Sequence, residues 1–327
     1  MREERPSVVV TFEHAAGEVA ELLAGDAVVE NVVGLPDAER ARALASADVL
    51  YAWNWRRELR SEEGPVLNAR FVQMLSAGVD HLPFEQLPPR AIVASNAGAY
   101  AEPMAEHVAA MALALLKRLP QNHAKLAAGV WNHDATNPTV HGAVCGVLGF
   151  GGIGKAAARL IRALGARIHA INTTGRSDEP AEFVGTLEDL DAVLAVADIL
   201  VIALPLTRRT DGLIGARELS LMKPTATLVN VARGAIIDEG ALYEHLRTHP
   251  EFSAGIDTWW IEPFSSGEFR VDYPFFDLPN LLGSPHNSAH RARVLDDAAV
   301  RGAANILRYL RGEHVAGVVR FDDYVDA

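Results

Sequence analysis

A glycine-rich turn between two apolar runs constrains the fold of this chain more than any other feature of the sequence. One apolar run ends at Leu148 and is followed by three glycines with the spacing G-x-G-x-x-G, at Gly149, Gly151 and Gly154. Apolar residues then recur at helical spacing, and residues 166–171 form a second apolar run. The pattern predicts a strand, a tight turn, a helix and a second strand.

A turn that holds a dinucleotide needs glycine for three separate reasons. One glycine makes the tight turn, one lets a pyrophosphate approach the backbone, and one lets helix and strand pack closely. The amino end of the helix also presents free N–H groups and a partial positive charge to phosphates. A purely structural glycine turn is the alternative, but the strand–helix–strand context favours dinucleotide binding. The predicted cofactor-binding residues of this turn are Gly149, Gly151, Gly152, Ile153 and Gly154.

Composition limits the class of protein. A chain of 327 residues, 49% of them hydrophobic, is long enough for about two domains with a large core. No apolar run is long enough to span a bilayer, and the sequence leads straight into a strand at Val8–Val10 rather than into a secretory signal, so we expect a cytoplasmic protein. The net charge of −12 argues against binding to nucleic acid or to a membrane surface. The single cysteine, Cys145, lies in a predicted buried strand and excludes an intramolecular disulfide, and we predict no metal site.

Strand-like and helix-like segments alternate along the whole chain, which predicts parallel sheets covered by helices. The predicted strands are residues 7–12, 27–33, 48–52, 70–75, 91–94, 144–148, 166–171, 198–204, 226–231, 253–257 and 280–282. The predicted helices are residues 15–23, 36–45, 101–119, 153–164, 187–195, 216–221, 239–246 and 292–310. Thr186 and Asp189 are spaced as a capping box for the helix at 187–195.

Three polar residues stand at loop positions after predicted strands in the second half of the chain: Arg233, Glu262 and His286. The carboxyl ends of parallel strands meet at one edge of a sheet, so we expect these residues on the same side as the glycine turn. Arginine binds a carboxylate with a two-pronged fork, and histidine carries a proton near neutral pH. A glutamate beside the histidine would hold the ring and favour its protonated form. Beside a nicotinamide, the set fits hydride transfer to or from a 2-hydroxy or 2-keto acid, although each residue alone fits a surface salt bridge equally well.

Loops after strands in the first half of the chain offer residues for the substrate. Trp53 and Trp55 follow one strand, where open α/β sheets bind ligands; the alternative is a solvated loop with tryptophans at a contact between domains or subunits. Small residues at 76–80 expose backbone N–H groups that suit a carboxylate, although alone they are only a turn. We interpret His107, near the start of the helix at 101–119, as a packed or interfacial histidine rather than a catalyst.

Together these motifs resemble the D-isomer-specific 2-hydroxyacid dehydrogenase family along nearly the whole chain. The matching stretches are Ala105-Glu106-His107, the turn at 149–154, Pro205-Leu206-Thr207, Val-Asn-Val-Ala-Arg-Gly at 229–234, Asp257 with Glu262-Pro263, and Ser284-Pro285-His286. The resemblance implies a Rossmann-type doubly wound cofactor domain, residues 98–288, inserted in a smaller flavodoxin-like α/β substrate domain, residues 1–97 and 289–327. It further implies an active site in the cleft between these domains, and a homodimer through the cofactor domain with the helix from Ala101 in the interface.

The resemblance also implies roles for individual residues. Arg233 would bind the substrate carboxylate and carbonyl, His286 would be the acid–base, and Glu262 would be its partner. Besides the glycine turn, the cofactor contacts implied are Leu204, Pro205, Val231, Ala232, Arg233, Asp257, which matches the nicotinamide side, and His286. The substrate-side residues are Trp53, the backbone of Ala77 and Gly78, Tyr100, Arg233 and His286.

The end of the strand at 166–171 departs from the family pattern. Relatives that use NAD usually carry an acidic residue there for the ribose hydroxyls. The polar side chains at this place in the chain are Asn172, Thr173, Thr174 and Arg176. With no carboxylate to repel a 2′-phosphate, and with hydroxyls and an arginine to bind one, we expect NADP to be preferred to NAD; the alternative is a solvated Arg176 and use of both. The next acids, Asp178 and Glu179, are expected to point to solvent.

The predicted activity is hydride transfer between a nicotinamide cofactor and a small 2-hydroxy or 2-keto acid, of the glyoxylate/hydroxypyruvate reductase type. A non-catalytic NAD(P)-sensing binding protein of the same fold is the alternative, because some relatives act as corepressors and can keep the catalytic residues. Turnover on 2-keto acids separates the two.

Overall fold

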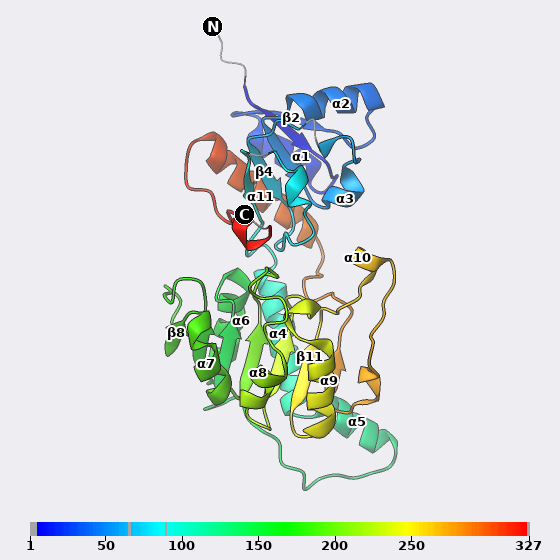
Figure 1. Cartoon of the computed structure of the whole chain (residues 1–327), viewed down its shortest axis with the longest axis vertical. Coiled ribbons are helices and arrows are strands. Elements are labelled where there is room, and N and C mark those ends of the chain that lie inside the picture. Colours follow the sequence, from blue (N-terminus) through cyan, green and yellow to red (C-terminus); the bar gives the residue numbers. More distant parts are fainter. Residues whose placement is uncertain (1–4, 65–66, 89, 326–327) are drawn as a thin grey trace. The chain divides into compact units, whose positions relative to one another are not determined.

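The computed structural model describes residues 5–64, 67–88 and 90–325, and the chain divides into two compact units (Figure 1). Unit 1 comprises Met1–Tyr100 and Arg291–Ala327, and unit 2 comprises Ala101–His290. In each unit all pairs of named strands are parallel. The predicted α/β class with parallel sheets is therefore confirmed.

The sheet of unit 1 has five strands in the order β2-β1-β3-β4-β5. The strands are β1 (Ser7–Val10), β2 (Val28–Asn31), β3 (Val49–Ala52), β4 (Phe71–Met74) and β5 (Ile92–Ala94). The helices are α1 (Ala16–Leu23), α2 (Asp37–Ser46), α3 (Trp55–Glu58) and α11 (Val294–Leu310), with 3₁₀ turns η2 (Phe84–Gln86) and η6 (Phe321–Asp323). This strand order is that of flavodoxin-like sheets, and β3 and β4 are wholly buried because helices lie on both faces.

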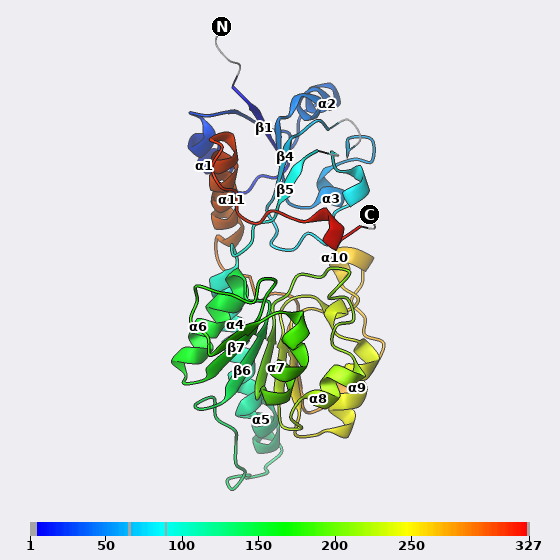
Figure 2. The ribbon, with the colours of Figure 1, turned by 60° about the vertical axis from the view of Figure 1, so that its left-hand side comes forward.

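Helix α11 belongs to unit 1 although all of unit 2 separates it from the rest of that unit in sequence. It packs beside α1 on one face of the sheet (Figure 2). The buried hydroxyl of Tyr51 donates to the carbonyl of Ala299 at 2.9 Å, and Asn96 Nδ2 donates to the carbonyl of Ala298 at 2.8 Å. Gly302 leaves room for the Tyr51 ring, because a Cβ at Gly302 would lie 2.1 Å from the hydroxyl oxygen. These contacts hold two distant segments of the chain in one unit.

The sheet of unit 2 has seven strands in the order β12-β11-β10-β9-β6-β7-β8. The strands are β6 (Val144–Leu148), β7 (Arg167–Ile171), β8 (Phe183–Gly185), β9 (Ile199–Ile202), β10 (Thr227–Asn230), β11 (Ser253–Ile256) and β12 (Leu281–Gly283). The helices are α4 (Ala101–Leu116), α5 (Leu119–Ala127), α6 (Gly152–Ala163), α7 (Leu190–Val196), α8 (Ala216–Leu221), α9 (Glu239–Thr248) and α10 (Pro263–Ser266), with 3₁₀ turns η3 (Leu187–Asp189), η4 (Gly234–Ile236) and η5 (Phe275–Asp277). Helices α4 and α6 cover one face, and α7, α8 and α9 cover the other (Figure 2). The sheet is doubly wound, and its strand order reverses between β6 and β9.

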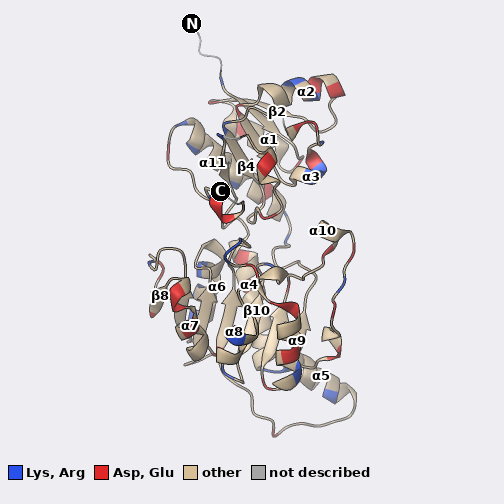
Figure 3. Ribbon diagram, viewed as in Figure 1, with Lys and Arg blue, Asp and Glu red and all other residues tan. Residues whose placement is uncertain are grey.

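The central strands β9 and β10 consist only of uncharged residues, whereas the helices carry many charged ones (Figure 3). A strand that helices cover on both faces is shielded from water, which explains why these two strands carry no charge. In the described part of the chain, no helix combines the length and the apolarity needed to cross a bilayer.

The prediction of one helix over residues 101–119 was wrong. Helix α4 ends at Leu116, Arg118 takes a left-handed conformation with φ +50°, and α5 starts at Leu119. Pro120 lies in the first turn of α5, where its missing N–H costs nothing, so the proline starts a second helix rather than continuing the first. The sequence interpretation also missed α3, α10 and the short edge strand β8. The capping box of Thr186 and Asp189 is present as predicted.

Candidate active site

Two of the three glycines in the turn after β6 are required by close packing, and the third leaves its backbone open. Gly149 has φ +95°, and a Cβ there would lie 2.6 Å from the backbone of Ala203 at the end of β9. A Cβ at Gly154 would lie 2.0 Å from the carbonyl oxygen of Gly149, so that glycine lets α6 pack on the turn. A Cβ at Gly151 would meet no atom within 4 Å, so the backbone there is open to a ligand.

The amino end of α6 fits a pyrophosphate. Gly151 is the residue before this 12-residue helix, and no described side chain caps its first turn. The N–H groups of Gly149 and Phe150 already donate to the carbonyl of Ile171. The first N–H groups of α6, from Gly152 onward, therefore remain for phosphate oxygens, where the helix dipole also favours negative charge.

Asn172 holds the turn after β7 with its own side chain. Its Oδ1 accepts from the N–H of Thr174 at 3.0 Å and of Gly175 at 2.8 Å, and its Nδ2 donates to the carbonyl of Arg176 at 2.7 Å. Thr173, Thr174 and Arg176 are exposed. The amide of Asn172 thus shapes the turn, and the Arg176 guanidinium makes no hydrogen bond or ion pair with any described residue.

The expectation that Asp178 and Glu179 point to solvent was wrong for Glu179 and incomplete for Asp178. Glu179 Oε2 lies 2.9 Å from Arg159 Nε, and its side chain is only 19% exposed. Asp178 is largely exposed but forms an ion pair with Lys155. Both cations lie on α6, whose exposed face runs alongside this loop, so its charges attract the acids back onto the helix.

His286 and Glu262 form a direct pair after strands β12 and β11. His286 Nδ1 lies 3.0 Å from Glu262 Oε1 and 2.9 Å from Oε2. Glu262 Oε1 also accepts from the N–H of Trp259 at 2.7 Å, which fixes the carboxylate from behind. No described residue bonds to the other ring nitrogen, Nε2. The carboxylate therefore sets the ring orientation and leaves Nε2 for a reacting group.

His286 has a left-handed backbone, with φ +52°, which is uncommon for a residue other than glycine. Its N–H donates to the carbonyl of Asp257 at 2.8 Å. Backbone strain of this kind persists where surrounding contacts over-determine it and clusters at functional sites. The left-handed conformation of His286 is therefore held by contacts of the loop after β12.

Asp257 is fully buried and accepts several hydrogen bonds from the loop that carries His286. Its Oδ1 accepts from Ser284 Oγ at 2.5 Å and from the N–H of Asn287 at 3.1 Å, and its Oδ2 accepts from the N–H of Ser288 at 3.1 Å. Burial alone would raise the pKa of Asp257, but the hydrogen bonds from Ser284 and Ser288 and the neighbouring His107 outweigh it and leave the pKa below its usual range. The implied contact of Asp257 with the nicotinamide side stays a prediction; in the structure both of its oxygens accept hydrogen bonds from this loop.

Arg233 follows β10 and is half-buried. The fully buried Asn230 braces the turn: its Oδ1 accepts from the N–H of Ala232 at 3.0 Å and its Nδ2 donates to the carbonyl of Arg233 at 2.9 Å. The side chains of Val231 and Ala232 are buried, so only their backbone is available to a ligand. Sequence reasoning missed Asn230, although an asparagine at a strand end is a common turn signal.

The candidate cofactor and catalytic residues of unit 2 share one edge of its sheet. They follow the parallel strands β6, β7, β9, β10, β11 and β12, and the strand order reverses beside the glycine turn. Leu204 is half-buried and Pro205 exposed just after β9. Open α/β sheets bind ligands at the carboxyl ends of their strands, at the point where the strand order reverses.

A cavity of about 330 Å³ adjoins His286 and Glu262. Its lining residues are Trp259, Glu262, Pro263, Phe264, Phe269, Phe276, Gly283, Ser284, Pro285 and His286. The ring of Phe264 stands edge-on to that of His286, with centroids 5.5 Å apart. Trp259, Phe264, Phe269 and Phe276 give it large apolar walls, and none of the described lining residues is a lysine or arginine.

Apart from Arg233 and His286, the substrate-side residues predicted from the sequence belong to unit 1, at the carboxyl edge of its own sheet. Trp53, after β3, is 37% exposed and stands edge-on to His14. Ala77 and Gly78 follow β4 and are half-buried. Tyr100, after β5, is 8% exposed, and its hydroxyl donates to the carbonyl of Leu75 at 2.9 Å.

The alternative of Trp55 as a substrate residue was wrong. Trp55 lies in the short helix α3, not in a loop, and is 3% exposed within the core of unit 1. A helical turn directs its indole inward, whereas Trp53 precedes that turn and stays at the surface.

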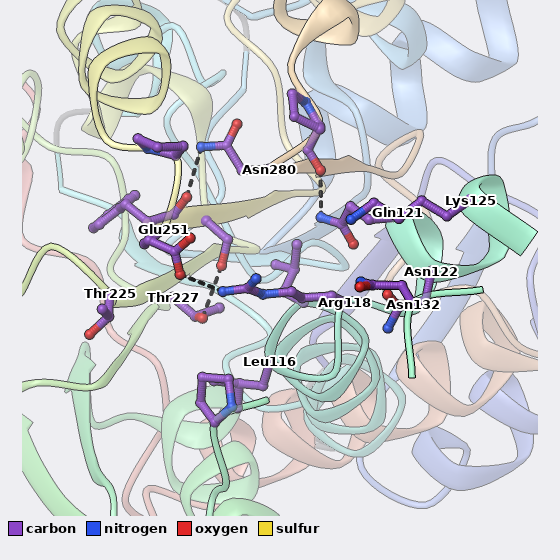
Figure 4. Close-up of a pocket in the computed structure, with 16 residues that line it drawn as sticks. Leu116, Arg118, Gln121, Asn122, Lys125, Asn132, Thr225, Thr227, Glu251 and Asn280 are labelled. Carbon is purple, nitrogen blue, oxygen red and sulfur yellow. Dashed lines mark hydrogen bonds and ion pairs between the residues drawn. The ribbon is translucent and has the colours of Figure 1, made fainter. Parts of the chain in front are cut away.

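A second cavity of unit 2, about 250 Å³, lies at the amino ends of β10 and β11 (Figure 4). Arg118 pairs with Glu251 across it at 2.5 Å, and Gln121 Nε2 donates to the carbonyl of Pro279 at 2.5 Å. Thr227, the first residue of β10, lines it. This cavity is at the opposite edge of the sheet from the glycine turn and shares no residue with the candidate active site.

A doubly wound sheet with a glycine turn, and with a histidine–glutamate pair at the same edge, defines a nucleotide-binding unit of the dehydrogenase class. Residues 109–288 match the family model described as "D-isomer specific 2-hydroxyacid dehydrogenase, NAD binding domain". The chain belongs to the D-isomer-specific 2-hydroxyacid dehydrogenase family.

Individual relatives agree with this assignment. The chain is 34% identical over 253 residues to the glyoxylate/hydroxypyruvate reductase B of Pectobacterium carotovorum subsp. carotovorum, covering 75% of this chain and 77% of the relative. It is 30% identical over 295 residues to the D-3-phosphoglycerate dehydrogenase of Methanocaldococcus jannaschii, covering 89% of this chain but only 55% of the relative. A solved D-isomer specific 2-hydroxyacid dehydrogenase from Xanthobacter autotrophicus Py2, in complex with NADPH and MES, has a TM-score of 0.82 and 25% identity over 98% of this chain and all of that one.

Proposed function

We propose that this protein is an NAD(P)-dependent oxidoreductase that interconverts a small 2-hydroxy acid and its 2-keto acid. The observation that carries the proposal is the His286–Glu262 pair, with both carboxylate oxygens within 3.0 Å of Nδ1, at the edge of the sheet where the glycine turn lies. Family membership supports the same activity.

The bound cofactor would supply or accept the hydride. Reduction also requires a proton at the former carbonyl oxygen, and His286 would donate it from Nε2. Glu262 holds the ring through Nδ1 and keeps Nε2 turned away from the carboxylate. Arg233 would bind the carboxylate of the substrate with its guanidinium fork, and in the oxidative direction His286 would accept the hydroxyl proton.

We propose a substrate of the glyoxylate or hydroxypyruvate type, with an uncharged side chain. The cavity beside His286 supports this, because none of its described lining residues is a lysine or arginine that would bind a phosphate. In unit 1, the backbone of Ala77 and Gly78 would bind the substrate carboxylate, and Trp53 and Tyr100 would contact the substrate side chain. Relatives named glyoxylate/hydroxypyruvate reductase support the same substrate class.

NADP is the cofactor we propose to be preferred. Arg176 is exposed beside Thr173 and Thr174 and has no competing partner among the described residues. The NADPH complex of the Xanthobacter relative supports the same direction.

We further propose a homodimer through unit 2. Helix α5 has no buried residue, although it is amphipathic. Leu119, Leu126, Val130 and Trp131, on α5 and just after it, are 57%, 55%, 51% and 79% exposed. Apolar side chains gathered in this way mark an interface, and a second copy would cover them.

The test of the activity is a panel of 2-keto acids with small, aromatic and phosphorylated side chains. Each is mixed with NADPH or NADH and followed at the nicotinamide absorbance. We expect turnover with small uncharged keto acids. Cofactor binding without turnover on any member would instead indicate a non-catalytic NAD(P) sensor.

A further inference from the structure

His107, on α4, lies against the loop that carries His286. Its Nε2 is 2.9 Å from Ser284 Oγ and 3.7 Å from Asp257 Oδ1. The His107 side chain is 24% exposed and the Asp257 side chain is fully buried. The proposed proton transfer does not use His107, so its contacts need a separate explanation.

The hydrogen bonds fix the direction of donation along this chain of groups. Asp257 is ionised and can only accept, so the single hydroxyl proton of Ser284 goes to Asp257 Oδ1 at 2.5 Å. The Ser284 oxygen must then accept from His107 Nε2–H. Neutral and protonated His107 can both make this bond.

This series of hydrogen bonds, from His107 through Ser284 to Asp257, ends at the backbone around His286. Asp257 accepts from the N–H groups of Asn287 and Ser288, and its carbonyl accepts from the N–H of His286. These bonds enclose the one residue of the loop that has a left-handed backbone. Removing the donor on α4 would loosen Ser284 and, with it, the carboxylate that holds the loop.

We propose that His107 is a positioning residue: acting through Ser284 and Asp257, it holds His286 at the angle from which Nε2 meets the substrate oxygen. This inference rests on the proposed role of His286 as the proton carrier. It replaces the interpretation of His107 as a merely packed or interfacial histidine.

The experiment compares His107→Phe, which removes the donor but keeps a ring, with His107→Gln, whose side-chain amide can donate from a similar position. The readouts are kcat and KM on one good keto acid, the cofactor Kd, and Tm. A misplacement of about 1 Å costs roughly a hundredfold in rate, so we expect His107→Phe to lower kcat by about ten- to a hundredfold. We expect His107→Gln to stay within about threefold of wild type, with cofactor Kd unchanged in both.

Two further variants keep the test decisive. Ser284→Ala breaks the same series of hydrogen bonds by a substitution outside α4. We therefore expect the same loss of kcat, and this test remains if His107→Phe folds poorly. In a His286→Ala background, His107→Phe should cause no further loss, because a residue that acts only through His286 is non-additive with it. His314→Phe, at an exposed histidine after α11, is the matched control and should leave kcat unchanged.

A wild-type kcat in His107→Phe, or equal losses in the Phe and Gln variants, would overturn the proposal. Additive losses in the double variant would also overturn it, because His107 would then act elsewhere. Turnover that survives His286→Ala would contradict the proposed function itself, which is a separate result.

Discussion

The two edges of the sheet in unit 2 carry cavities of similar size but use their polar groups differently. At the amino edge, the polar groups bind one another. Arg118 forms an ion pair with Glu251, Gln121 donates to the carbonyl of Pro279, and Asn280 Nδ2 donates to carbonyls that include that of Phe252. At the carboxyl edge, similar bonds orient groups and leave their reacting atoms open, as at His286 Nε2. Polar residues at an edge are therefore not by themselves a site; what matters is which atoms the surrounding bonds leave for a ligand.

The sharpest way to break this comparison is at the carboxyl edge. His286→Ala removes the proposed proton carrier and should lower kcat by roughly 10²–10⁴, the usual worth of general acid–base catalysis. Cofactor binding should stay nearly unchanged, because the glycine turn lies on other strands. The measurement is steady-state turnover together with a fluorescence titration of NADPH. Near wild-type turnover would remove His286 from the chemistry.

The second prediction concerns the turn after β7. A charge-assisted contact to a 2′-phosphate is worth roughly 1.5–3 kcal/mol, so we expect NADPH to be favoured over NADH by about ten- to a hundredfold in kcat/KM. Arg176→Ala should remove most of this preference and leave the turn intact, because Asn172 bonds only to the carbonyl of Arg176 and not to its side chain. Kinetics with both cofactors on one keto acid provide the measurement.

The double variant Asn172→Asp with Arg176→Ala should reverse the preference by adding a repelling carboxylate. The new carboxylate keeps the acceptor for the N–H groups of Thr174 and Gly175 but loses the donor to the carbonyl of residue 176. A wild-type enzyme that favours NADH would show that the missing acid at this strand end is not selective.

Sequence reasoning predicted the parts of the site that depend on local pattern. The glycine spacing and the strand-end positions of Arg233, Glu262 and His286 follow from short stretches of chain, and parallel strands bring such positions to one edge. It could not show that His286 is left-handed, or that Asp257 is buried beneath its loop, because those features depend on contacts with residues far away in sequence such as His107. The interpretation of Trp55 as a substrate residue was wrong for the same reason, because only the tertiary packing decides which tryptophan is buried.

The third prediction tests the amino edge. Asn280 is 5% exposed, and its Nδ2 donates to the carbonyls of Leu246 at 3.0 Å and Phe252 at 2.8 Å, which ties the end of α9 to the start of β12. Asn280→Ala leaves these carbonyls unpaired and should lower the free energy of unfolding by about 1–3 kcal/mol. Asn280→Asp should be worse, because a carboxylate would face carbonyl oxygens.

Urea unfolding measures this cost, and kcat should stay within about threefold of wild type in Asn280→Ala. A larger loss of kcat would show that the two edges are coupled through β12. The amino edge would then affect catalysis as well as stability, and the contrast between the two edges of the sheet would not hold.

The last and smallest predicted effect is a pH dependence of stability near the amino edge. The ring of His245, on α9, stacks on that of His249 with centroids 4.2 Å apart and stands edge-on to the buried Phe252 at 4.6 Å. Burial, assisted by the charge of His249, lowers the pKa of His245 from 6.5 to about 4. Since the unfolded chain then binds the proton more readily than the folded one, this contribution to stability is complete above pH 6.5 and is lost as the pH falls from 6.5 to about 4.

The full shift would correspond to about 3 kcal/mol, and partial solvent access reduces the expected loss to about 1–2 kcal/mol. His245→Gln cannot titrate, so its free energy of unfolding should fall less between pH 7.5 and pH 4.5 than that of the wild type, while carboxylate effects remain common to both. His314→Gln, at an exposed position, is the control and should keep the wild-type slope. Urea unfolding at several pH values provides the measurement, and equal slopes for His245→Gln and wild type would mean that His245 titrates alike in the folded and unfolded chains. The amino edge would then contribute packing to the fold but no pH dependence of its own.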